Sequence, residues 1–151
     1  MTSYSFLPTL QCKADVDAAI KGTDDLVVVL RFGRATDNVC MQLDHVLEKS
    51  CGDVAKMAKI FLVDVDAVPI YSQYLDITLI PATVFFFNGQ HIKVDWGSPD
   101  HTKFIGTFKV KQHFIDVVET IFRGAMKGKV IVQSPLDPAD ITKYELIFKD
   151  I

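Results

Sequence analysis

Two short apolar runs separated by a helical pattern constrain the fold of this chain more than any other feature. Leu26–Leu30 and Ile60–Val63 are continuous runs, and their β-branched residues are typical of strands buried on both faces. Between them, apolar residues recur with the spacing of one helix face, at Val39, Leu43, Val46 and Leu47. A strand, a helix and a strand in this order predict a parallel pair joined by a crossover.

The second half of the chain indicates antiparallel pairing instead. Thr83–Phe87 and His91–Asp95 have the composition of strands, and they flank Asn88-Gly89, the dipeptide best suited to a type I′ hairpin turn. A helix with a broad apolar face follows over residues 114–122. Gly124 is expected at its C-terminal end.

Two shorter helices complete the predicted order. One covers about Lys13–Lys21, and another begins at Pro69, since proline is favoured in the first turn of a helix. From the first buried strand onward the order is βαβαββα, which predicts an α/β fold of the thioredoxin type, with a central mixed sheet flanked by helices. We expect a domain over residues 1–125 and a C-terminal extension over residues 126–151. The extension is expected to pack on the domain or lie at an interface, through apolar residues that include Ile141, Tyr144, Leu146, Ile147 and Phe148.

Charge and cysteine content exclude several classes of function. The 151 residues include 16 Lys and Arg and 19 Asp and Glu, and the formal charge of −3 gives no overall attraction to nucleic acid or to an anionic membrane. Cys12, Cys40 and Cys51 are too few for a secreted disulfide framework and favour a reducing compartment. We expect no signal peptide and no membrane-spanning segment.

Two local features sharpen the predicted fold. The first is Ile80-Pro81 directly before a strand, because in thioredoxin-like folds the bond before that proline is cis. The second is Asp37-Asn-Val-Cys40 at the start of a helix, where a C-x-x-C redox motif would stand. A dithiol oxidoreductase needs an attacking thiolate at the first position and a resolving thiol at the second. Asp37 can cap the helix but cannot attack a disulfide, so we expect no dithiol catalysis.

Cys40 occupies the resolving position, and its partner is an open question in the sequence. Cys51 lies about 16 Å away along an unbroken helix, which is beyond disulfide reach. A disulfide between Cys40 and Cys12 stays open, although burial of all three cysteines as small apolar residues is favoured. The alternative function is a monothiol redox protein that uses Cys40.

No catalytic, cofactor-binding or metal site is predicted elsewhere. The four histidines lack metal-ligand spacing, and phosphate-binding, dinucleotide-binding and nucleophile-elbow motifs are missing from the sequence. Asp64 and Asp66 end a predicted strand, where capping is favoured over catalysis.

A small basic stretch of Arg123, Lys127 and Lys129 is a candidate contact patch. It would support only a weak, salt-sensitive contact with RNA. Cations near the C-terminal end of a helix explain these three residues equally well.

Several segments of the sequence together resemble the Dim-type thioredoxin-like spliceosomal proteins, over about residues 4–135. Besides the D-x-x-C motif, the segments that carry the resemblance are Val27–Gly33, Leu62–Pro69, Pro81–Phe87 and Val118–Gly128. The resemblance implies a nuclear, non-catalytic adaptor in pre-mRNA splicing, with a link to cell-cycle progression. It also implies that the partners are protein components of the small nuclear ribonucleoproteins.

The resemblance further implies a large splicing-factor scaffold of the repeat type as partner, with a homodimer as a second possibility. Direct contact with RNA is expected to be weak or absent. Members close to the founding protein carry a cysteine directly after the cis-proline, which can pair with the D-x-x-C cysteine. This chain has Ala82 there, so that disulfide is excluded. The segment from about Asp137 also departs from the founding pattern.

Overall fold

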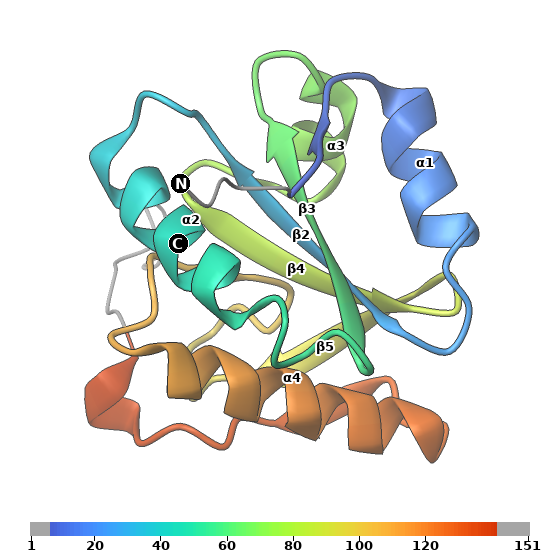
Figure 1. The fold of residues 1–151 in the computed structure, drawn as a ribbon, viewed down its shortest axis with the longest axis vertical. Helices are drawn as coiled ribbons and strands as arrows, with labels where there is room; N and C mark the ends of the chain where they lie inside the picture. Colours follow the sequence, from blue (N-terminus) through green and yellow to red (C-terminus); the bar gives the residue numbers. More distant parts are fainter. Residues whose placement is uncertain (1–6, 142–151) are drawn as a thin grey trace.

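The computed structural model describes residues 7–141, in which the predicted elements occur in the predicted order (Figure 1). In chain order they are β1 (Thr9–Leu10), α1 (Lys13–Lys21), β2 (Val27–Gly33), α2 (Asn38–Ser50), β3 (Ala58–Asp64), α3 (Pro69–Tyr74), β4 (Ala82–Phe87), β5 (Gln90–Asp95), β6 (Phe104–Ile105), α4 (Lys111–Met126), β7 (Ile131–Gln133) and the 3₁₀ helix η1 (Pro138–Asp140). The expected roles of Tyr144, Leu146, Ile147 and Phe148 fall outside the described residues.

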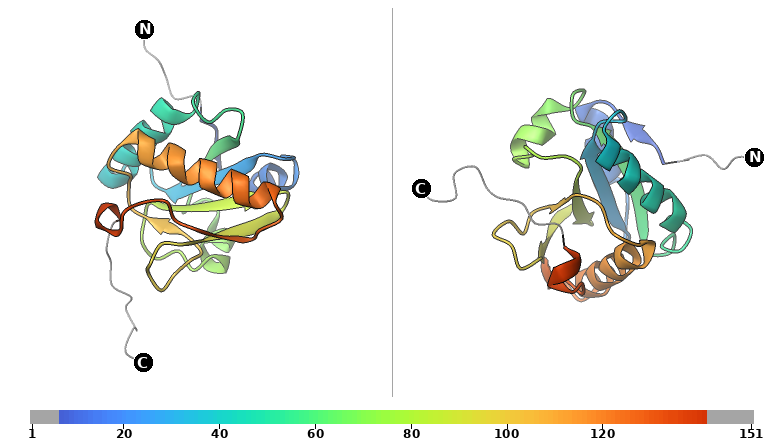
Figure 2. Two further views of the ribbon diagram at one scale, coloured as in Figure 1. Left: turned by 90° about the horizontal axis from the view of Figure 1, so that it is seen from below. Right: turned by 90° about the vertical axis from the view of Figure 1, so that its left-hand side faces the viewer.

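The central sheet is mixed, as the sequence predicts. Its strand order is β1-β3-β2-β4-β5-β7, and β6 pairs with β4 off this path. β2 runs parallel to β3 over its whole length and antiparallel to β4. Helices α2 and α4 lie on one face of the sheet, and α1 and α3 lie on the other (Figure 2).

β2 is the centre of the molecule because every one of its residues is buried. Its side chains alternate between the two faces, so that Val27 and Val29 join the core under α2 and α4 while Val28 and Leu30 join the core under α1 and α3. This arrangement explains the continuous apolar run, since a strand covered on both faces has no polar side.

The turn between β4 and β5 has the geometry that its sequence predicts. Asn88 and Gly89 both adopt positive φ, at 50° and 84°, as a type I′ turn requires. The Asn88 side chain also fixes the loop before β2, because its Oδ1 accepts a hydrogen bond from the backbone N–H of Asp25 at 2.7 Å.

The end of α4 differs from the prediction. The helix passes through Gly124 and ends at Met126, and Gly128 then takes a positive φ of 86°. A Cβ on Gly124 would lie 2.5 Å from Cγ1 of Val132, so this glycine allows β7 to approach the helix closely. Its role is therefore packing rather than helix termination.

The chain after α4 turns back along the helix and reaches the edge of the sheet, as Figures 1 and 2 show. There β7 pairs in parallel with β5, in the register Lys93 to Ile131. Val132 and Leu136 are buried in the core, and Ile141 packs against it. Neither β7 nor the other two short strands, β1 and β6, were expected from the sequence.

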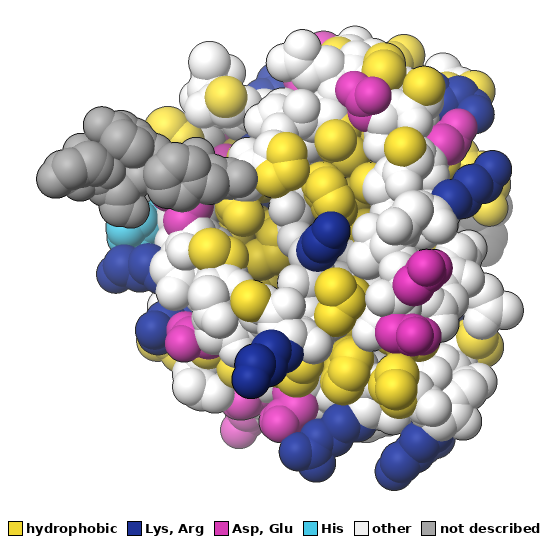
Figure 3. Space-filling model, turned by 45° about the vertical axis from the view of Figure 1, so that its right-hand side comes forward, with side chains coloured by type: hydrophobic (Ala, Val, Ile, Leu, Met, Phe, Trp, Pro, Cys, Tyr) yellow, Lys and Arg dark blue, Asp and Glu magenta, His cyan; other side chains and the backbone are white. Residues whose placement is uncertain are grey.

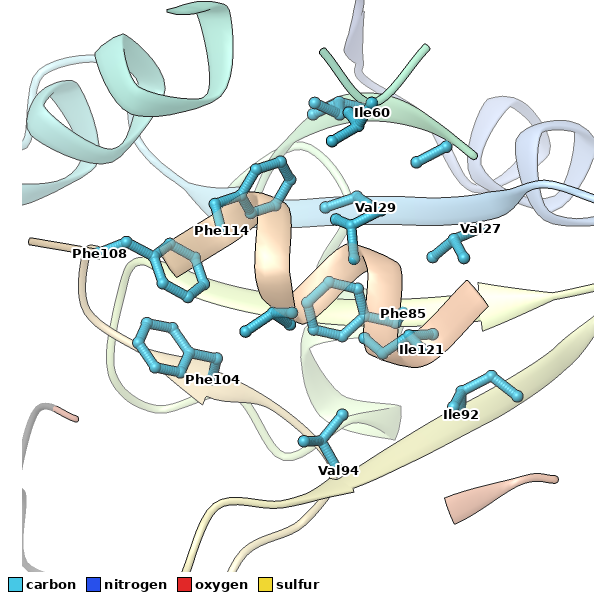
Figure 4. Packing of buried hydrophobic residues seen from close by; sticks show 14 of the residues in the cluster. Val27, Val29, Ile60, Phe85, Ile92, Val94, Phe104, Phe108, Phe114 and Ile121 are labelled. Carbon is cyan, nitrogen blue, oxygen red and sulfur yellow. The ribbon is translucent and has the colours of Figure 1, made fainter. Parts of the chain in front are cut away.

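The larger core contains a row of aromatic rings beneath α4 (Figure 4). Trp96 contacts Phe104 with ring centroids 4.8 Å apart, Phe104 stacks on Phe108 at 4.3 Å, and Phe108 contacts Phe114 at 5.5 Å. The row joins β6, the loop after it and the first turns of α4. It thereby holds the first turns of α4 against β6, which pairs with the start of β4 next to Pro81.

Candidate functional site

The start of α2 is capped by Asp37, as its position in the sequence predicts. Asp37 has extended backbone angles, and its carboxylate accepts a hydrogen bond from the backbone N–H of Cys40 at 2.9 Å. This bond stabilises the charged form and holds the pKa of the Asp37 carboxyl below its ordinary value. The side chain at the first position of the motif thus serves as the N-terminal cap of α2.

Cys40 points inward and is fully buried. A Cβ on Gly33 would lie 2.5 Å from the Cys40 sulfur, so the thiol packs directly on the glycine backbone of β2. Burial, together with the neighbouring Asp37 carboxylate, raises the pKa of the Cys40 thiol to about 11. The carboxylate that caps the helix therefore opposes thiolate formation.

These features bear on the monothiol alternative. With a pKa of about 11, roughly one thiol in ten thousand is ionised at neutral pH. The Cys40 sulfur is also closed off from solvent. Cys12 and Cys51 are exposed, so the expected burial of all three cysteines is wrong for these two, and all three thiols are free. The disulfide between Cys12 and Cys40 that the sequence left open is not formed. The arrangement disfavours attack by Cys40 on a disulfide or on glutathione.

A buried ion pair lies next to this thiol. Arg31 of β2 donates two hydrogen bonds to the carboxylate of Asp44 in α2, both at 2.8 Å. The two side chains are only 4% and 15% exposed. The pair ties strand to helix directly behind Cys40, and sequence reasoning did not assign it. The available signal was an arginine directly following a continuous apolar strand, which is unusual without a charged partner.

Asp64 and Asp66 do not form a catalytic pair. The Asp64 carboxylate accepts a hydrogen bond from the backbone N–H of Asp66 at 2.9 Å and so caps the turn after β3, which confirms the capping interpretation for that residue. Asp66 instead binds Arg34 through two hydrogen bonds, at 2.8 and 3.1 Å. The Arg34 guanidinium lowers the pKa of the Asp66 carboxyl.

The bond between Ile80 and Pro81 is cis, which the sequence left open. Pro81 leads into β4, where Ala82 lies opposite Phe32 of β2. The sheet thus brings the cis-proline to the same edge as the end of β2 and the start of α2. Ala82 is fully buried and places a methyl group where a second thiol would be needed.

The basic stretch lies elsewhere, at the C-terminal end of α4 and in the turn after it. Arg123 forms an ion pair with Glu119, one turn earlier in the helix, at 3.0 Å. Lys127 and Lys129 are exposed and form no ion pair with any residue from 7 to 141. The structure therefore keeps these three residues together but separates them from the D-x-x-C motif.

Two further findings concern the described part of the chain. Within it, no three His, Cys, Asp or Glu side chains are grouped so that they could hold a metal ion. Over the same residues, no helix has both the length and the apolar character needed to cross a membrane.

Solved structures resemble this arrangement at the level of the fold. Chloroplastic thioredoxin z superimposes with a TM-score of 0.63 at 21% identity, covering 78% of this chain and 96% of that chain. The thioredoxin of Malassezia sympodialis gives 0.61 at 20% identity, covering 81% and 96%. The chain thus has the thioredoxin fold.

Sequence comparison places the chain more narrowly. It belongs to the family described as mitosis protein DIM1, whose sequence profile matches residues 6–138. Thioredoxin-like protein 4B of Homo sapiens is 63% identical over 145 residues, which are 96% of this chain and 97% of the relative. Mitosis protein dim1 of Schizosaccharomyces pombe is 39% identical, covering 92% and 98%. Spliceosomal protein DIB1 of Saccharomyces cerevisiae is 37% identical, covering 87% and 92%.

Proposed function

We propose that this protein is a non-catalytic adaptor that acts in pre-mRNA splicing by binding protein components of the spliceosome. The names of two relatives, spliceosomal protein DIB1 and mitosis protein dim1, support a role in splicing and a linked role in cell-cycle progression. Both relatives align with most of this chain, so the proposal concerns the whole domain rather than one motif.

The non-catalytic part of the proposal rests on the structural contacts that the two end residues of the D-x-x-C motif make. Asp37 holds the helix start through its hydrogen bond to Cys40, and the Cys40 thiol packs against Gly33 with a raised pKa. We therefore regard Asp37, Cys40 and Pro81 as the remnant of a redox site that now stabilises the fold. What remains for function is the surface of the domain.

The surface supports protein partners more than RNA. On the face seen in Figure 3, hydrophobic side chains gather across the centre, and charged side chains of both signs are interspersed around them. A nucleic-acid-binding face would need cations of one sign along a continuous track. Apolar side chains inside a polar rim are instead typical of protein interfaces.

The finer parts of the proposal concern location and partners. Spliceosomal relatives support a nuclear location, and a large repeat-type splicing scaffold is the proposed partner, with a homodimer as the second option. We also propose that the extension over residues 126–151 contributes to these contacts. Its described part supports this, because β7 and Leu136 pack on the domain while Met126 and Ile131 remain exposed.

The proposal is tested by affinity capture from nuclear extract with quantitative mass spectrometry, comparing the wild-type chain with Cys40→Ser. Both chains should capture the same spliceosomal proteins, because the buried thiol takes no part in binding. A third chain, Asp37→Cys, restores the dithiol motif and serves as a positive control for thiol trapping.

Two outcomes would contradict the proposal. One is the absence of spliceosomal proteins from the wild-type capture. The other is a set of functionally unrelated proteins that are held through disulfides by the wild type and lost in Cys40→Ser. The second outcome would establish the monothiol alternative.

A further inference from the structure

β7 is the last described strand at its end of the sheet, and only one side of its backbone is paired. The N–H of Lys93 donates to the carbonyl oxygen of Val130 at 2.9 Å, and the N–H of Ser134 donates to the carbonyl oxygen of Asp95 at 3.0 Å. These two bonds fix which residues of this segment face β5, since alternate residues of a parallel strand pair with the same neighbour.

The alternation turns the backbone groups of Ile131 and Gln133 away from β5. Both residues are exposed, whereas the intervening Val132 is buried in the core. Within residues 7–141, no backbone group pairs with the outward N–H and C=O groups of these two residues. β7 therefore presents four free backbone groups, in the spacing that an added strand would need.

The free edge adjoins a continuous exposed segment. All six residues from 126 to 131 are exposed, and three of them are large and apolar. Met126 is 56% exposed, Val130 46% and Ile131 49%. These side chains would lose contact with water if another strand were placed along β7.

The same segment is basic. Lys127 and Lys129 lie within it, and Lys93 lies opposite Ile131 on β5. None of the three lysines forms an ion pair with any residue from 7 to 141. Asp95 lies opposite Gln133 and is the acidic residue in this register. The three lysines outnumber it, so the local charge is positive, opposite in sign to the formal charge of −3 of the whole chain.

From these features we propose that the outer edge of β7 is a docking site where an acidic, extended segment of a partner protein adds as a further strand. The free backbone groups of Ile131 and Gln133 would hold the strand, and Lys93, Lys127 and Lys129 would select its acidic side chains. This inference rests on the proposed function, because it names the kind of protein segment that the adaptor binds.

An added protein strand explains more of this site than RNA does. Three lysines would attract phosphates as well as carboxylates, but the RNA backbone does not offer the alternating N–H and C=O groups that pair with a strand edge. Single-stranded RNA also needs exposed aromatic rings on which its bases can stack. The apolar side chains of this segment are aliphatic, and aliphatic side chains suit the alternating residues of a strand.

The test is a titration of the full chain, followed by NMR, with a synthetic peptide of five Glu-Val repeats at low salt. We expect the amide protons of Ile131 and Gln133 to shift and to exchange more slowly with solvent. A Lys-Val peptide of the same length should not bind. A Glu-Val peptide N-methylated along one edge should not bind either, because it cannot form the hydrogen bonds of the ladder.

Two variants distinguish the contribution of the backbone edge of β7 from that of the lysine charges. Ile131→Pro removes an outward N–H without removing a bond to β5, and it should weaken binding by about tenfold or more. The double variant Lys127→Glu, Lys129→Glu should weaken it by about tenfold and flatten its salt dependence. The control is Lys56→Glu, Lys59→Glu, which makes the same charge change near and on β3 and should stay within about twofold of the wild type.

The inference is overturned if the Glu-Val peptide does not bind, or if it binds equally well to all variants. It is also overturned if a single-stranded RNA oligonucleotide binds the lysines and the peptide does not. If these results occur while the wild-type chain still captures spliceosomal proteins, the docking site fails and the proposed function stands. If no spliceosomal protein is captured, the proposed function itself fails.

Discussion

Asp37 and Cys40, at the two ends of the D-x-x-C motif, both make structural contacts at the start of α2. The Asp37 carboxylate binds the helix start, and the Cys40 thiol fills the space above Gly33. Disulfide exchange needs a nucleophile at the first position and a reactive thiolate, whereas this motif has a carboxylate first and a Cys40 thiol with a pKa raised to about 11.

The buried thiol predicts an unusual pattern of alkylation. In the native protein at neutral pH, Cys12 and Cys51 should react with iodoacetamide at ordinary rates and Cys40 much more slowly. In denaturant all three cysteines should react alike, because the pKa of Cys40 then returns to its ordinary value. Mass spectrometry of digested samples measures each rate. Fast labelling of native Cys40 would show that the thiolate is accessible.

The same shift gives a pH dependence of stability with a definite sign. The pKa of Cys40 is raised from 9.0 to about 11 on folding, so the native state holds its proton more tightly. The stabilising contribution is complete below pH 9 and is lost as the pH rises toward 11. Urea unfolding of Cys40→Ala should show a smaller decline over this interval than the wild type. An equal decline in both chains would mean that other groups cause it.

The ion pair between Arg31 and Asp44 predicts a large effect of one substitution. Asp44→Asn leaves a buried guanidinium without its counter-charge and should lower the free energy of unfolding by about 3 kcal/mol. The control is Asp66→Asn, which breaks the exposed pair with Arg34 and should cost no more than about 1 kcal/mol. Urea denaturation measures both. Similar costs for the two variants would show that burial does not matter here.

At this scale the sequence predicts local contacts better than distant ones. The cap formed by Asp37 involves a residue three positions away, so its spacing alone indicates it. The pairing of Arg31 with Asp44 depends on how α2 lies against β2, and that of Arg34 with Asp66 depends on the meeting of two loops. No periodicity in the sequence encodes these distances.

At the scale of elements, the long strands and helices follow from the sequence and the shortest strands do not. β2 and the hairpin of β4 and β5 carry apolar runs and a turn dipeptide, which are strong local signals. β1, β6 and β7 have only two or three residues, too few for an alternation to appear. Their pairing partners define them, and those lie far away in the sequence.

Gly124 shows that a glycine near the end of a helical pattern can serve either to end the helix or to allow close packing. A glycine near the end of a helical pattern predicts termination, but here α4 continues because Val132 requires close approach. We expect Gly124→Ala to lower the free energy of unfolding by about 1–3 kcal/mol, despite the better helix propensity of alanine.

Combining Gly124→Ala with Val132→Ala should cost less than the sum of the two single variants, because the second substitution relieves the clash. Gly52→Ala is the control, since no atom lies within 4 Å of its added Cβ. It should change the stability by no more than about 0.5 kcal/mol. Thermal or urea unfolding measures the series. Strict additivity at Gly124 and Val132 would contradict a direct contact.

At the scale of the whole molecule, the sheet separates two cores. The core under α2 and α4 contains the aromatic row. The core under α1 and α3 is mostly aliphatic, with Phe32 and Phe86 as its buried aromatic side chains, and no residue of α3 is buried. The face of the sheet under α3 is therefore less tightly packed by its helix than the face under α4. Amide exchange should therefore be faster in α3 than in α4.

The separation also governs how substitutions combine. Leu47→Ala in α2 and Val16→Ala in α1 lie on opposite faces of the sheet, so their effects on the free energy of unfolding should add within about 0.5 kcal/mol. Phe104→Leu and Phe108→Leu remove two stacked rings and should not add. Urea unfolding of the single and double variants tests this. Strong coupling across the sheet would refute it.

If substitutions in the two cores act independently on stability, the sequences of the two cores can change at different rates during evolution. A substitution under α1 or α3 would require no compensating change under α4, where the chain turns back toward β7. Related chains could therefore acquire different surfaces on one side while the other side keeps its sequence. In this family, new partners could arise on one face without loss of those already bound on the other.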